Sequence, residues 1–163
     1  MRNLKLDELF IGAWVKSIVP VPEGGPMLLS EPEYVSGIFE GGGLYLNFEG
    51  NGGDPFDCRV DEVAPVQMDE DSLRGFGFVR VAKGENVWMK SVGDIRLTIS
   101  LRQRFGRQEC RRAAISGRFA CWNEEIRYIH ELQSWWRDKV LLPYGVGLPM
   151  RWDPDSRGKE ELG

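Results

Sequence analysis

Residues 34–48 read Tyr34-Val35-Ser36-Gly37-Ile38-Phe39-Glu40-Gly41-Gly42-Gly43-Leu44-Tyr45-Leu46-Asn47-Phe48. Two runs rich in β-branched, aromatic and other apolar residues flank a turn made of one glutamate and three glycines. Glycine adopts the positive φ angles of a tight reversal without steric cost, and runs of this composition favour strands. The segment therefore predicts a β-hairpin.

Shorter segments of strand composition lie on both sides of this hairpin, at residues 10–19, 56–60 and 63–66. They are separated from it by two stretches dense in proline or glycine, residues 20–33 and 50–55, where neither a helix nor a central strand is expected. Four or five short strands in a segment of about 60 residues are typical of a small barrel. We therefore expect a small β-barrel over residues 8–68.

The second half of the chain has a different pattern. Residues 69–74 predict a short helix, because Asp69 is a favourable N-cap and acids in the first turn favour the positive end of the helix dipole. Strand composition follows in segments 78–81, 87–90, 95–102 and 108–122. Strict alternation in the third of these places four residues on a buried face: Ile95, Leu97, Ile99 and Leu101. These strands predict a β-meander.

One helix is expected near the C-terminus, beginning after Asn123 and ending before Pro143, which cannot continue it. Helical spacing predicts a buried face of Ile126, Ile129, Leu132, Gln133, Trp136 and Val140. The expected fold class is thus mainly β (α+β), with a small barrel packed on an antiparallel meander and one helix. The meander and helix occupy residues 69–150, and the polar tail at 151–163 is expected to be disordered.

The helix carries a recognisable motif, Tyr128-Ile129-His130-Glu131-Leu132-Gln133. It resembles the Tyr-Val-His-x-Leu-Gln motif of a family of small uncharacterised proteins from gut-dwelling anaerobic bacteria and their mobile elements. Residues 11–15 are similar to the Ile-Gly-x-x-Val segment of that family, and residues 65–76 resemble its middle block. The resemblance implies an SH3-like barrel at residues 8–68 and brings no activity with it.

We interpret the motif residues Tyr128, His130, Leu132 and Gln133 as structural. His130 and Glu131 are adjacent in sequence and point about 100° apart on a helix, so they cannot form an acid–base pair with each other. Buried polar side chains need hydrogen-bond partners, and such a role would account for His130 and Gln133.

The charge of the chain is small overall and unevenly distributed. It has 21 Lys plus Arg against 25 Asp plus Glu, a net of −4, which argues against a protein dedicated to non-specific binding of polyanions. Residues 96–118, however, contain seven arginines and one acid, Glu109. Arginine matches phosphate geometry, so this segment predicts nucleic-acid binding through Arg102, Arg104, Arg107, Arg111 and Arg112. Alternatively, this basic face meets the acidic first half of the chain or is solvated.

No nucleophile with a base, carboxylate pair, metal-ligand spacing or phosphate loop can be assembled from the sequence. We therefore expect no enzymatic activity, no cofactor and no metal. Three widely spaced cysteines favour reduced thiols, and no apolar run approaches the roughly 18 residues of a membrane span. These features predict a cytoplasmic protein that binds no membrane.

The leading functional hypothesis is a non-enzymatic interaction or adaptor module that binds an unidentified protein. Small barrels bind through loops and one exposed face, so the expected contact residues are Trp14, Tyr34 and Tyr45, near the loops at 20–33 and 50–55. Nucleic-acid binding by residues 96–118 is the alternative. The sequence predicts neither the pathway nor the oligomeric state.

Overall fold

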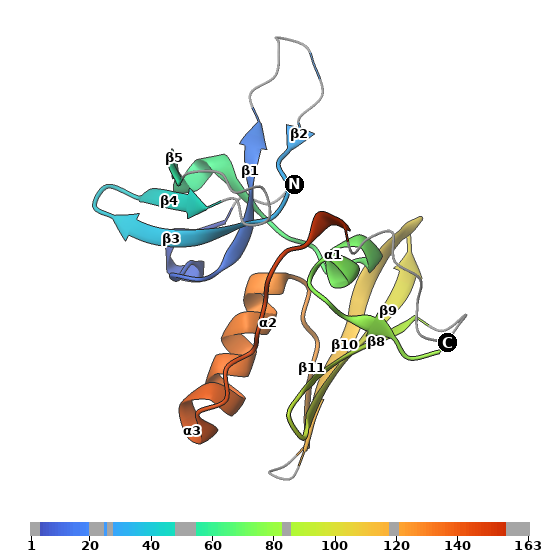
Figure 1. Ribbon diagram of the computed structural model, residues 1–163. Coiled ribbons are helices and arrows are strands. Elements are labelled where there is room, and N and C mark those ends of the chain that lie inside the picture. Colours follow the sequence, from blue (N-terminus) through green and yellow to red (C-terminus); the bar gives the residue numbers. More distant parts are fainter. Residues whose placement is uncertain are drawn as a thin grey trace. The chain divides into compact units, whose positions relative to one another are not determined.

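The structure is a computed structural model that describes residues 4–19, 25, 28–47, 55–82, 86–117 and 121–155. It consists of two units, Met1–Val66 and Gln67–Gly163. Each unit contains one antiparallel sheet, so the predicted mainly β class with two sheets and a C-terminal helix is confirmed (Figure 1).

The N-terminal unit is built on one curled sheet. Its strands are β1 (Trp14–Val19), β2 (Leu28–Leu29), β3 (Glu33–Phe39), β4 (Gly43–Asn47), β5 (Phe56–Arg59) and β6 (Val63–Pro65), with short 3₁₀ turns at Leu6–Glu8 and Val60–Glu62. They are ordered β2-β1-β3-β4-β5, and β6 returns to pair with β1. Since β5 and β6 are not paired in the described residues, the sheet is a half-barrel.

The hairpin predicted at residues 34–48 is formed by β3 and β4. Phe39 pairs with Gly43 and Tyr34 pairs with Asn47. Gly41 and Gly42 have φ angles of 89° and 78°, which L-residues with a side chain rarely adopt. The glycine-rich turn therefore closes the hairpin for the reason that the sequence indicates.

Strand β1 begins later than predicted, at Trp14 instead of residue 10. Gly12 has a φ of 96°, and the Ala13 N–H donates to the Phe10 carbonyl oxygen at 3.0 Å, so a turn precedes the strand. The core of this unit is formed by inward-facing residues of the sheet and by three residues before it: Leu4, Leu9, Ala13, Val15, Val35, Leu44, Leu46 and Val63.

The C-terminal unit contains the predicted meander. After helix α1 (Glu70–Gly75) come β7 (Val79–Arg80), β8 (Val87–Val92), β9 (Ile95–Arg104), β10 (Arg107–Ser116) and β11 (Cys121–Glu124). Each of these strands pairs with the next one in the chain. Ile95, Leu97, Ile99 and Leu101 are all buried, as the alternation predicts. Asp69 caps α1 by accepting a hydrogen bond from the Ser72 N–H at 2.9 Å.

The C-terminal helix begins and ends elsewhere than predicted. Asn123 lies in β11, and helix α2 (Ile129–Trp136) starts six residues later. At that start the Glu131 carboxylate accepts a hydrogen bond from the Tyr128 N–H at 3.2 Å. The helix then continues through a π-helical turn (Arg137–Leu141) into α3 (Leu142–Tyr144), which contains Pro143. A π turn bonds each N–H five residues back, so it can absorb the irregularity that proline imposes.

The chain after the helix is packed against the start of the unit, at variance with the expected disorder from residue 151. Trp152 is buried, and its ring centroid lies 5.2 Å from that of Phe76. The Asp153 N–H donates to the Gly75 carbonyl oxygen at 2.8 Å. The expectation is thus wrong for residues 151–155, because burial of the Trp152 side chain offsets the conformational entropy that these residues lose on ordering. Residues 156–163 lie outside the described residues.

Candidate functional site

The three aromatic residues predicted to bind a partner differ in exposure. Trp14 is 3% exposed, and its ring packs edge-on against Tyr34 with ring centroids 5.5 Å apart. This burial corrects the expectation for Trp14, since a buried indole offers no surface to a partner. Tyr34 is half-buried, and its hydroxyl oxygen accepts a hydrogen bond from Asn47 Nδ2. Tyr45 alone of the three is exposed, at 46%.

Tyr45 belongs to a pair of exposed rings that the sequence alone does not assemble. It lies opposite Gly37 in the register, and Phe39 lies two residues further along on the same face. The centroids of the Phe39 and Tyr45 rings are 4.9 Å apart, and Phe39 is 40% exposed. We call the outer surface formed by Gly37, Phe39, Gly43 and Tyr45 the aromatic face.

Two glycines leave room for these rings on the sheet. A Cβ atom at Gly43 would stand 2.1 Å from the Phe39 ring, and one at Gly37 would stand 3.0 Å from Tyr45 Cδ2. The rings therefore occupy the space that side chains at these two positions would fill. Both rings remain partly exposed to solvent in this arrangement.

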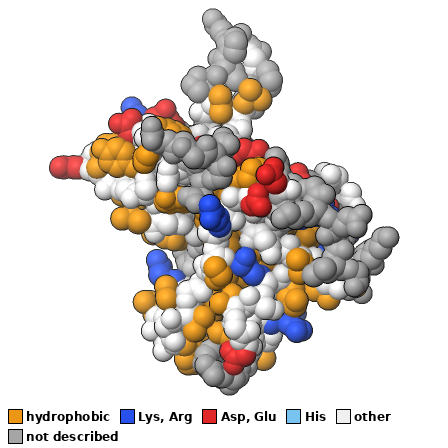
Figure 2. Space-filling view, viewed as in Figure 1, with side chains coloured by type: hydrophobic (Ala, Val, Ile, Leu, Met, Phe, Trp, Pro, Cys, Tyr) orange, Lys and Arg blue, Asp and Glu red, His pale blue; other side chains and the backbone are white. Residues whose placement is uncertain are grey.

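A pocket of about 520 Å³ opens beside the aromatic face. It is lined by Phe39, Gly41, Gly43, Asp57, Cys58, Arg59 and Glu62. Asp57 lies opposite Tyr45 in the register of β4 and β5, so a carboxylate borders the rings. Figure 2 shows acidic and hydrophobic side chains side by side over β3–β5, at the upper left.

The electrostatics of this pocket are negative. The pKa of the Cys58 thiol is raised to about 11, first by its burial and then by the charges of Glu62, Glu33, Asp57 and Asp61. Arg59 is paired with Asp61 at 3.3 Å, which offsets part of its positive charge. Over residues 1–66 the chain has 11 acidic and 4 basic side chains, so the field around the pocket favours a cation.

A second polar group lies inside the half-barrel. Glu33 is buried, and its Oε1 accepts a hydrogen bond from the Ser17 hydroxyl at 2.8 Å. Burial raises the pKa of Glu33, and hydrogen bonds from Ser30 and Ser17 partly oppose that shift. Its Oε2 is buried without a hydrogen-bond partner among the described residues. This carboxyl was not among the predicted functional residues, because strand composition around it does not reveal its burial.

The loops predicted to flank the binding surface are largely outside the described residues. The structure describes residues 25 and 28–33 of the first loop and residue 55 of the second. Within the first, Leu28–Leu29 forms the short strand β2 paired with β1. The contribution of the remaining loop residues to binding stays a prediction.

The arginine segment forms the hairpin of β9 and β10. Arg96 and Arg112 are exposed, whereas Arg102 is half-buried and lies 3.9 Å from Glu109 and 3.8 Å from Glu125. The side chains of Arg104, Arg107 and Arg111 lie outside the described residues. The register places Arg96, Arg102 and Arg112 on the face opposite the buried residues Leu97 and Ile99.

The histidine motif lies on the buried side of helix α2. His130 is 3% exposed, and its ring stacks on that of Tyr128 with centroids 5.8 Å apart. Leu132 is fully buried and Gln133 is half-buried. Glu131 is occupied at the helix start, where it accepts from the backbone N–H groups of Arg127 and Tyr128. These surroundings favour the structural interpretation of the motif.

Neither a metal site nor a membrane-spanning helix is present in the part of the chain that the structure describes. There, no three His, Cys, Asp or Glu side chains are grouped closely enough to hold a metal ion. No helix of the described residues has the length and apolar character needed to cross a bilayer.

Comparisons with protein-family models, curated proteins and solved structures found no match to this chain. The candidate site therefore rests on its own geometry.

Proposed function

We propose that this chain is a non-enzymatic interaction module whose N-terminal unit binds a basic segment of a partner protein at the aromatic face. The observation that carries the proposal is the pair of exposed rings, Phe39 and Tyr45, beside a pocket bordered by carboxylates. The rings can make a cation–π contact with a lysine or arginine side chain, and the neighbouring carboxylates attract the same side chain by their opposite charge.

Cys58 provides independent support for a cationic ligand. The four carboxylates that raise the pKa of its thiol would equally stabilise a positive charge placed in the pocket. The raised pKa also keeps Cys58 protonated near neutral pH, so it is not a thiolate nucleophile. His130 is buried in helix α2 of the other unit. The protonated state of Cys58 and the burial of His130 both favour binding over catalysis.

The finer fold and family assignments are part of the same proposal. The curled sheet of β1–β6 is compatible with an SH3-like barrel. Small barrels of this kind bind their ligands at one exposed face and at the loops beside it. We further propose that the chain belongs to the mobile-element family that its motifs resemble, and that it acts in the cytoplasm.

The experiment is selection from a displayed library of short random peptides, followed by affinity measurement of the selected peptides. We expect the selected peptides to contain lysine or arginine. Phe39→Ala and Tyr45→Ala should each weaken binding about tenfold or more, because central aromatic side chains dominate the energy of small interfaces. Asp57→Asn should weaken it less and reduce its dependence on salt.

Ile11→Ala is the matched control, since Ile11 is a highly exposed apolar residue of the same unit outside the aromatic face. Its affinity for the selected peptides should equal that of the unmodified protein, and all variants should keep the same thermal unfolding. Selected peptides that lack basic residues, or that bind Phe39→Ala and Tyr45→Ala unchanged, would discard the proposal.

A further inference from the structure

The hairpin of β9 and β10 ends in a turn that is unfavourable for the residue it contains. Phe105 and Gly106 connect the strands, with φ angles of 51° and 77°. Two-residue hairpin turns with positive φ at both positions favour Asn-Gly or Gly-Gly. Phenylalanine in this left-handed conformation costs about 1–2 kcal/mol.

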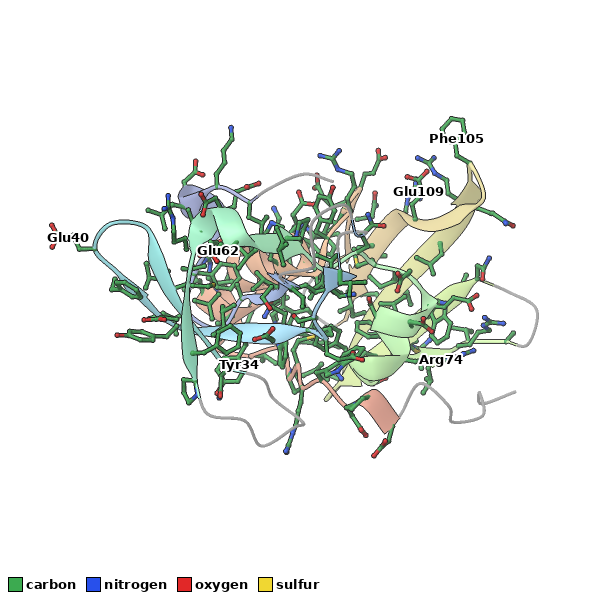
Figure 3. The ribbon with its side chains drawn as sticks, turned by 90° about the horizontal axis from the view of Figure 1, so that it is seen from above. Tyr34, Glu40, Glu62, Arg74, Phe105 and Glu109 are labelled. Carbon is green, nitrogen blue, oxygen red and sulfur yellow. The ribbon has the colours of Figure 1, made fainter. Side chains whose placement is uncertain are left out.

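Phe105 is also the most exposed large hydrophobic residue of the described chain, at 85%. Figure 3 shows its side chain at the end of the hairpin, pointing away from the ribbon. The residue therefore combines a left-handed backbone conformation with a largely exposed apolar ring. Strain of this kind is concentrated at binding sites and catalytic sites.

The strands that carry Phe105 extend beyond the rest of their sheet. Strand β8 pairs with β9 only as far as Ser100, and β11 pairs with β10 only as far as Ala113. Residues 102–109 thus form a two-stranded ribbon without a third strand in the described residues. Such a ribbon can enter a groove or lie along an extended ligand from either side.

The ribbon is basic by sequence and by register. Arg104 and Arg107 occupy directly opposite positions beside the turn, and Arg102 is opposite Glu109, the only acid between residues 96 and 118. Arg102 lies 3.9 Å from Glu109 and 3.8 Å from Glu125, so part of its charge is balanced within the protein. Exposed Arg112 continues the positive charge along β10. An anionic ligand along this ribbon would be neutralised at several points.

We propose that this ribbon tip binds single-stranded nucleic acid, with Phe105 stacking on an unpaired base and the surrounding arginines contacting phosphates. Stacking of a base on an aromatic side chain contributes about 1–3 kcal/mol, and it requires a base face that a duplex does not expose. This site lies in the other unit from the aromatic face and does not depend on the protein-binding function proposed above.

An anionic membrane is the competing ligand, and the composition of the tip disfavours it. The segment Gln103-Arg104-Phe105-Gly106-Arg107-Gln108 contains a single apolar side chain. Stable membrane attachment needs a larger inserted apolar area or a second anchor. One ring is enough to stack on one base.

The test measures fluorescence anisotropy of labelled single-stranded DNA and RNA oligonucleotides of mixed sequence, titrated with the full chain. We expect an affinity that falls linearly with salt on logarithmic axes. Arg104→Glu combined with Arg107→Glu should abolish binding. Phe105→Ala should weaken it by about 5- to 150-fold, the range that corresponds to the stacking energy.

Phe105→Asn separates binding from folding, because asparagine tolerates the left-handed turn. This variant should unfold at the same or a higher temperature than the unmodified protein while binding oligonucleotides as weakly as Phe105→Ala. Tyr45→Ala, in the other unit, should bind them normally. Phe105→Trp should retain binding, since a larger ring still stacks.

Three results would overturn the proposal. They are the absence of binding to both oligonucleotides, equal binding by Phe105→Asn and the unmodified protein, and binding to anionic lipid vesicles but not to oligonucleotides. Preference for DNA over RNA, or the reverse, would identify the natural ligand within the proposed class.

Discussion

Glu33 shows how a single carboxyl group links stability to pH. Burial raises its pKa above the ordinary value of 4.5, so between these two values the folded protein holds a proton that the unfolded chain has lost. The free energy of unfolding therefore falls as pH rises through this window, and the loss is complete above the raised pKa.

We predict that Glu33→Gln raises the melting temperature at neutral pH and flattens its dependence on pH above 4.5. Glutamine keeps an oxygen that can accept from the Ser17 hydroxyl, and it removes the cost of burying a charge. Melting curves over a pH series measure the effect, with exposed Glu40→Gln as the control. A lower melting temperature at neutral pH would show that the charge itself is required.

Cys58 offers a second prediction at the scale of one residue. A pKa raised from 9.0 to about 11 reduces the thiolate fraction near neutral pH by about 100-fold, and the thiolate is the reactive species. We expect iodoacetamide to modify exposed Cys121 well before half-buried Cys58, as followed by mass spectrometry of the native protein. Faster modification of Cys58 in an Asp57→Asn, Glu62→Gln variant would support the role of the carboxylates, whereas equal rates at both cysteines in the unmodified protein would contradict it.

At the scale of elements, the chain after α3 packs against helix α1 of the C-terminal unit. A Cβ atom at Gly75 would stand 1.8 Å from Trp152 Cζ3, so alanine there must displace the indole. The same backbone position also accepts the hydrogen bond from Asp153. The last described segment is thus attached to α1 by a ring and by the backbone.

We predict that Gly75→Ala destabilises the protein by about 1–3 kcal/mol, the usual cost of overpacking. In a Trp152→Ala background the same change should cost much less, because the obstructing ring is gone. Urea unfolding of the four proteins gives the coupling energy. Gly147→Ala, where nothing lies within 4 Å of an added Cβ, is the control and should have little effect. Equal costs in both backgrounds would mean that Trp152 does not occupy this position in solution.

The elements also show which local patterns are sufficient for prediction. The alternation of β9, the Asp69 cap and the glycines of the β3–β4 turn each act through neighbouring backbone, so their outcome does not depend on the rest of the fold. The predicted start of the C-terminal helix was wrong because Asn123 pairs with β10 as part of strand β11. Its predicted end was wrong because a π turn allows the helix to continue past Pro143. Both are effects of context that override a local signal.

At the scale of the whole molecule, the two units carry charges of opposite sign. Residues 1–66 have 11 acids and 4 bases, which leaves the C-terminal unit with 14 acids and 17 bases. The two proposed sites follow this division, one with a pocket for a cation and the other with a ribbon for an anion. A chain built in this way can hold a protein and a nucleic acid at separate surfaces.

Sequence alone was enough for the mainly β class, the central hairpin, the meander and the capped helix α1, because these depend on side-chain alternation, turn residues and caps within a few positions. The tertiary structure was needed to show that Trp14 is buried while Tyr45 meets Phe39, and that Trp152 fills the space above Gly75. These facts depend on strand register and on contacts between residues far apart in the chain. Local composition does not encode which of several aromatic rings a distant segment will cover.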